Sequence, residues 1–95
     1  MKIKRFWYAM NTGWEHDKYE YVLRNTEAIN VHNGKPYFKI YGYCEETRIT
    51  HIMDVNLQMD CCWVVNGVEY FIQTKEQLFN FKNLLDSIII DEALK

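Results

Sequence analysis

An apolar residue at nearly every second position of residues 49–65 is the feature that most constrains this fold. Every odd-numbered position in that segment is apolar except His51, and the even positions from Asp54 to Asp60 are all polar. A period of two puts successive side chains on opposite faces of an extended chain, so the segment predicts half-buried β-strand structure. At ~3.3 Å per residue, one flat strand of this length would exceed the width of a small domain. We therefore expect a bend or bulge near Asp60–Cys61.

Two Asn-Gly pairs mark hairpin turns, at Asn33-Gly34 and Asn66-Gly67. Both residue types tolerate positive φ, which two-residue hairpin turns require. The second turn predicts that the strands on either side of it oppose each other in register and share an apolar face. The expected pairs are Val65 with Val68, Trp63 with Tyr70, and Cys61 with Ile72.

The first half of the chain gives a less uniform prediction of secondary structure. Residues 3–10 and 37–44 predict strands, whereas residues 14–18 have the composition of an exposed loop. Residues 19–32 are ambiguous. Alternation at Tyr19, Tyr21 and Leu23 favours a strand, residues 29–31 suggest another, and a short helical turn from Thr26 is an alternative.

The C-terminal segment predicts an amphipathic helix over about 75–94. Thr74 and Gln77 have the spacing of a capping box, and apolar residues recur at helical spacing along Leu78, Phe81, Leu85, Ile88 and Ile89. With strands placed within residues 3–73, the chain is expected to be one α+β domain. Its bent antiparallel β-sheet would have about five or six strands packed on the single C-terminal helix. A final strand followed by a capped helix resembles the end of pleckstrin-homology-like barrels, over about a quarter of the chain.

Composition narrows the class of partner. The 95 residues carry a net charge of −2, and this argues against duplex nucleic acid, which requires a basic surface. The three cysteines are an odd count, and Cys61 and Cys62 are adjacent, so they would point to opposite faces of a strand. Reduced thiols in the cytoplasm are the simpler interpretation. No apolar run has the length of a membrane span.

No catalytic motif is present. Glycine-rich phosphate loops, G-x-S-x-G, H-E-x-x-H and C-x-x-C are all absent. His51, on the apolar face of its strand, is either a general base or ligand, or a hydrogen-bonded residue near the rim. His16 between Glu15 and Asp17 is either part of a metal cluster or an exposed charged loop. The cysteines and His51 lack structural zinc spacing. We expect no enzyme activity, no catalytic residues, no metal and no cofactor.

The strongest candidate for a binding surface is a row of aromatic residues. Tyr37, Lys39, Tyr41 and Tyr43 share one face of their predicted strand, opposite Phe38, Ile40 and Cys44. Tyrosine is enriched at interface hot spots, although it also favours strands without any binding role. The expected partner-binding residues are Trp14, Tyr37, Lys39, Tyr41, Tyr43 and Arg48.

These features predict a small binding protein that acts by occupying a macromolecular partner, most simply a protein. Phage-encoded inhibitors of bacterial defence and toxin-neutralising immunity proteins have this profile, which is an association and not a motif. The alternative is a small-ligand protein that holds a nucleotide-like molecule between aromatic rings and Lys39, Arg48 or Arg5, with a homodimer providing more room. A single-stranded RNA binder that uses the tyrosines is a further, weaker hypothesis.

Overall fold

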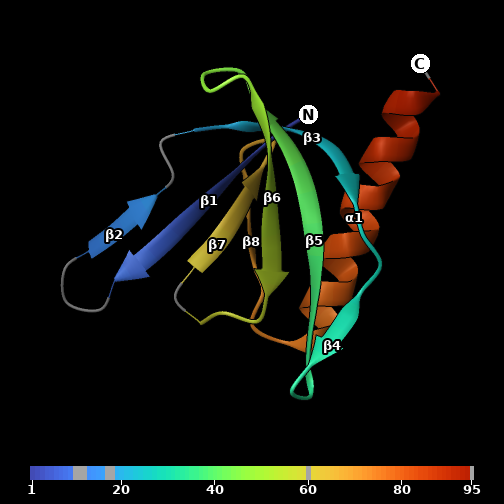
Figure 1. The fold of residues 1–95 in the computed structure, drawn as a ribbon. Coiled ribbons are helices and arrows are strands. Elements are labelled where there is room, and N and C mark those ends of the chain that lie inside the picture. Colours follow the sequence, from blue (N-terminus) through green and yellow to red (C-terminus); the bar gives the residue numbers. More distant parts are fainter. Residues whose placement is uncertain (10–12, 17–18, 60, 95) are drawn as a thin grey trace.

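The computed structural model (Figure 1) describes the backbone of residues 1–9, 13–16, 19–59 and 61–94, and the side chains of these ranges except 7–9 and 13–16. Within them it has eight strands and one helix, and the α+β class with a bent antiparallel sheet and a C-terminal helix is confirmed. The elements are β1 (Lys2–Ala9), β2 (Gly13–His16), β3 (Tyr21–Thr26), β4 (Asn30–His32), β5 (Lys35–Cys44), β6 (Ile49–Asn56), β7 (Cys61–Val65), β8 (Val68–Phe71) and α1 (Lys75–Ala93).

One strongly bent sheet connects the eight described strands, and each pairing between them is antiparallel. Its main path is β6-β5-β3-β1-β7-β8, with β4 beside the N-terminal half of β5 and β2 beside the C-terminal half of β1. β6 occupies the edge of β5 opposite to β3 and β4, because Tyr37 pairs with both Asn30 and Asn56. The helix lies across β3 and β5 (Figure 1).

The long alternating segment is divided between two parts of the sheet. β6 pairs with β5, whereas β7 pairs with β1 and β8. The expected change of direction therefore falls between Asn56 and Cys61, and Asp60 lies outside the described residues. Beyond the end of β6, the backbone N–H of Gln58 donates to the carbonyl of Ile72 at 2.8 Å. That bond ties the connection between β6 and β7 to the end of β8.

The N-terminal half contains more strand than the sequence predicts. The expected loop at residues 14–18 is wrong for its first part, because Gly13–His16 form β2 and pair with β1. The ambiguous segment 19–32 forms β3 and β4, and residues 27–29 connect them without a helical turn. These two short strands, β2 and β4, raise the count above the expected five or six. Each pairs with a strand adjacent in the chain, β2 with β1 and β4 with β5, but strands of four and three residues are too short for a clear alternating pattern.

The predicted turns and cap are confirmed. Asn33-Gly34 and Asn66-Gly67 have φ of 51° and 75°, and of 54° and 81°, as a two-residue hairpin turn demands. Val65 opposes Val68 and Trp63 opposes Tyr70, whereas Ile72 lies just beyond the ladder. The helix begins with a reciprocal capping box between Thr74 and Gln77.

The core lies between the inner face of the sheet and the helix. Phe81 is its centre, with ring centroids 6.4 Å from both Phe38 and Trp63 and 5.4 Å from Tyr70. On β6 the predicted apolar face is buried at Val55 but 55% exposed at Ile49, because the helix covers β3 and β5 and does not extend over that end of β6.

Candidate functional site

β5 presents two different faces, as its alternation predicts. The even-numbered residues from Pro36 to Cys44 are buried, and the odd-numbered residues from Tyr37 to Tyr43 are half-buried. The latter lie on the outer face of the sheet, away from the helix. We call Tyr37, Lys39, Tyr41 and Tyr43, together with Ile52 opposite them, the tyrosine face.

β6 completes this surface. The residues directly opposite the four β5 side chains are Asn56, Asp54, Ile52 and Thr50, and directly opposed residues share a face. Ile52 stands opposite Tyr41 and is 59% exposed. The sequence analysis did not select Ile52. The sequence does carry a signal for it, because Ile52 is the one apolar residue among the even-numbered positions of β6.

Polar contacts hold the aromatic row in place. Lys39 Nζ donates to Asp54 Oδ1 at 2.9 Å, and this hydrogen bond and charge raise the pKa of Lys39. The Tyr41 hydroxyl donates to Glu27 Oε2 at 2.7 Å, which raises the pKa of Tyr41. Fixed side chains lose less conformational entropy on association than free ones, so the face is partly prepared for contact.

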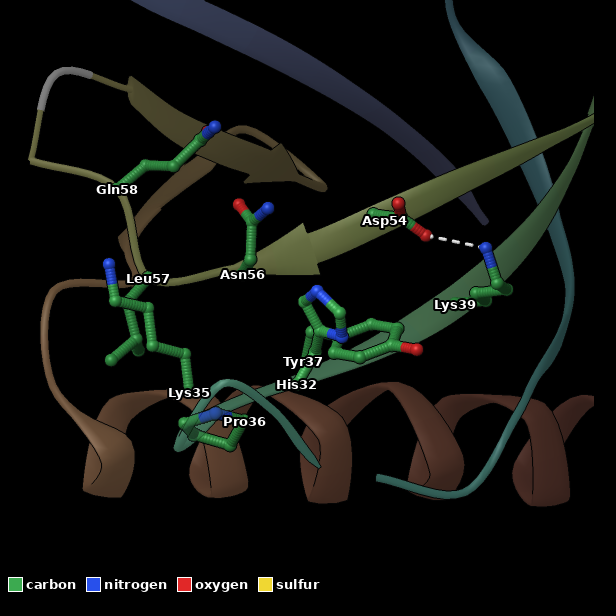
Figure 2. A pocket seen from close by; sticks show the side chains of 9 residues that line it. All are labelled: His32, Lys35, Pro36, Tyr37, Lys39, Asp54, Asn56, Leu57 and Gln58. Carbon is green, nitrogen blue, oxygen red and sulfur yellow. Dashed lines mark hydrogen bonds and ion pairs between the residues drawn. The ribbon is translucent and has the colours of Figure 1, made fainter. Parts of the chain in front are cut away.

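A pocket of about 520 Å³ continues the tyrosine face towards the β4–β5 hairpin (Figure 2). Figure 2 shows the Tyr37 ring between His32 and the Lys39–Asp54 ion pair, with Gln58 at the far side. Gln58 Oε1 accepts hydrogen bonds from Arg5 at 2.8 Å and from the Cys61 thiol at 2.7 Å, so this side of the pocket is anchored. The pocket is lined by His32, Lys35, Pro36, Tyr37, Lys39, Asp54, Asn56, Leu57 and Gln58.

The remaining predicted partner-binding residues lie elsewhere. Arg48 is exposed in the turn that follows β5, with φ of 61°, beyond the Tyr43 end of the face. Trp14 belongs by its backbone to β2, where it opposes Tyr8 of β1, and its side chain lies outside the described residues. The strand pairing thus groups Tyr37, Lys39, Tyr41 and Tyr43, and puts Trp14 on a strand that does not pair with β5.

Of the candidate chemical groups, His51 has structural partners in Thr47 and Tyr21. His51 Nε2 lies 3.0 Å from Thr47 Oγ1, and the His51 ring meets Tyr21 edge-on at 5.2 Å. The backbone of His16 lies in β2, and its side chain is not described. Cys44, Cys61 and Cys62 are buried, and none of them forms a disulfide with another described residue.

The described residues contain neither a metal-binding cluster nor a membrane-spanning helix. No group of three or more His, Cys, Asp or Glu side chains among them is arranged to hold a metal ion. No helix in the same part of the chain is long and apolar enough to cross a membrane. In comparisons with known proteins, no protein-family model, curated protein or solved structure matches this chain.

Proposed function

We propose that this domain is a non-enzymatic binding protein that occupies a protein partner through the tyrosine face, as an inhibitor or immunity protein does. A phage protein that blocks a bacterial defence factor is one instance of this class. The observation that carries the proposal is the half-buried aromatic row of β5 with the exposed Ile52 beside Tyr41. Tyrosine anchors next to apolar surface are the usual composition of interface hot spots.

The charges around the face favour a protein over a nucleic acid. Lys39 pairs with Asp54, and the Arg24 guanidinium carbon lies 5.4 Å from the centroid of the Tyr43 ring. Glu27 adds a carboxylate beside Tyr41. A phosphate backbone requires a surface with an excess of positive charge, whereas these groups alternate in sign. Mixed charges around an apolar centre suit a protein interface, where they set the association rate and the orientation.

The test is loss of a partner with Tyr41→Ala. Proteins captured by the tagged domain from cells that express it are compared for wild type, Tyr41→Ala and the control Phe79→Ala, which removes a 45% exposed aromatic side chain from the helix. We expect Tyr41→Ala to weaken partner binding by about 30-fold or more, the scale of a hot spot. If folded Tyr41→Ala captures the partner as well as folded Phe79→Ala does, the proposal is contradicted.

The pocket supports a second candidate, a small-ligand protein. Its volume lies within the range of ~300–1,000 Å³ typical of ligand sites, and it combines the Tyr37 ring with the cationic Lys35. A nucleotide-like molecule suits this pair, because an aromatic ring can stack on a base and an ammonium group can pair with a phosphate. Native mass spectrometry distinguishes the candidates: a mass excess of a few hundred daltons that is lost with Lys35→Ala favours the ligand, and a bare chain favours the protein partner.

A further inference from the structure

The edge of β6 that faces away from β5 has no backbone partner within the residues the structure describes. β6 pairs with β5 from Ile49 to Asn56, and β3 and β4 occupy the opposite edge of β5. The path of the sheet therefore ends at β6, which stands at the front in Figure 1. A free strand edge presents a row of N–H and C=O groups that can pair with another strand.

One printed hydrogen bond determines which groups point outward. The Lys39 carbonyl accepts from the Glu27 N–H at 2.8 Å, on the side of β3 and β4. Alternate residues of a strand direct their backbone groups to opposite edges, so the even residues of β5 direct theirs to β6. Their partners on β6 are the odd residues. The backbone groups left at the free edge are those of Thr50, Ile52, Asp54 and Asn56.

We propose that this edge pairs with the same edge of a second copy of the chain, and forms a two-fold antiparallel dimer with Ile52 on the axis. Ile52 then opposes Ile52 of the second copy, and Thr50 opposes Asp54 of the second copy. Residues opposed in this way exchange both of their backbone hydrogen bonds. The pairing extends the sheet across both copies, and it goes beyond the proposed function without depending on it.

Side-chain pairing selects this register. If the axis passed through Met53, Ile52 would oppose Asp54 of the second copy and an apolar side chain would face a carboxylate. If it passed through Asp54, two carboxylates would oppose each other, which destabilises an antiparallel pair. With the axis at Ile52, two exposed isoleucines cover each other, and the Tyr41–Ile52 pair of each copy continues into that of the other.

The charged side chains along this edge are too few to prevent it from pairing with another strand. Free edges usually carry charged side chains that deter pairing. Asp54 is the one charged side chain among the four outward-facing positions, and Lys39 Nζ lies 2.9 Å from it. A carboxylate already paired on its own sheet opposes association less than an unpaired one, so the second copy meets little repulsion.

The mass in solution tests the dimer. Light scattering on a dilution series should give twice the chain mass of 11.5 kDa for wild type, and the single-chain mass for Ile52→Lys, which would put two ammonium groups together on the axis. A single-chain mass for wild type throughout the series, or a dimer that survives Ile52→Lys, would overturn the proposal. Circular dichroism verifies that Ile52→Lys is folded.

A cysteine pair tests the register. Opposed residues in this pairing have Cα atoms ~5.5 Å apart, within the range for a disulfide. Oxidised Ile52→Cys should therefore form a covalent dimer, whereas Thr50→Cys, on the same face of the same strand, should not, because its neighbour is Asp54 of the second copy. The native cysteines are buried, so wild type serves as the blank. Cross-linking of both variants, or of neither, refutes this register. Both measurements use the isolated chain without any partner, so their outcome is separate from that of the proposed function.

Discussion

The two faces of β5 differ in chemistry, although their residues alternate along one strand. The inner face packs Phe38, Ile40 and Cys44 with no exposed surface, beneath the helix. The outer face holds tyrosines whose polar tips reach solvent and charged neighbours, such as Tyr41 with Glu27. The comparison shows how a chain of 95 residues can stabilise a core and display a binding surface on the same strand. It also implies that folding and binding are separable by single substitutions.

The largest loss of stability is expected from a substitution on the inner face of β5. Phe38→Ala removes a fully buried ring that contacts Phe81, and truncation of a core phenylalanine costs ~3–5 kcal/mol. The free energy of unfolding, measured by urea denaturation, should fall by that amount or the domain should not fold. A loss below about 1 kcal/mol would mean that the core relaxes around the cavity.

Gly42→Ala should cause the next largest loss of stability. A Cβ at Gly42 would lie 2.7 Å from the Tyr21 Cβ and 3.1 Å from the Met53 Cε, so the Tyr21 ring rests where a side chain would stand. Overpacking of this kind costs ~1–3 kcal/mol. Thermal unfolding followed by circular dichroism measures it, and an unchanged melting temperature would show that Tyr21 moves freely.

Asp86→Asn should have a smaller effect that depends on pH. Burial alone would raise the pKa of Asp86, but hydrogen bonds from Lys82 at 2.6 Å and Thr26 at 2.5 Å outweigh it and hold this pKa below its usual value. A carboxyl whose pKa is lowered by folding stabilises the fold above its unfolded pKa and loses this effect as the pH falls through the folded pKa.

At neutral pH we expect Asp86→Asn to cost ~1 kcal/mol, after allowance for solvent screening. The difference from wild type should shrink as the pH falls below about 4. Urea denaturation at several pH values measures it, and a difference that does not change with pH would exclude this carboxylate as the cause.

The smallest effect on stability is expected on the outer face. Tyr43→Ala removes a half-buried ring that stacks with Arg24, and substitutions away from core features usually change the unfolding free energy by ~0.5 kcal/mol or less. Chemical denaturation of Tyr43→Ala beside Phe38→Ala provides the comparison. A loss for Tyr43→Ala close to that for Phe38→Ala would remove the distinction between the faces.

The sequence predicts the parts of this fold that depend on local pattern. Alternation identifies both faces of β5, the Asn-Gly pairs locate two hairpins, and the capping box marks the start of the helix. It does not predict β2, because Trp14-Glu15-His16 reads as a loop until β1 pairs with it. Nor does it predict the division of residues 49–65 between different neighbours, since strand partners are set by distant contacts.

The candidate site is only partly readable from the sequence. The tyrosine row follows from a period of two, but the pocket forms where the β4–β5 hairpin meets the end of β6 and Gln58 is anchored by Arg5. Such a meeting of segments distant in sequence leaves no local signal. Ile52 was detectable as a break in the polar parity, whereas its position beside Tyr41 required the register of β5 and β6.

A substitution scan of residues 35–44 would test most directly whether the inner face of β5 stabilises the fold and the outer face binds the partner. Each position is replaced in turn by alanine, or Gly42 by serine, and both the soluble folded protein and the captured partner are measured. We expect losses with a period of two: even positions lose folding and binding together, and Tyr37, Lys39, Tyr41 and Tyr43 lose binding alone. Odd positions that affect neither quantity would contradict a binding role for the tyrosine face.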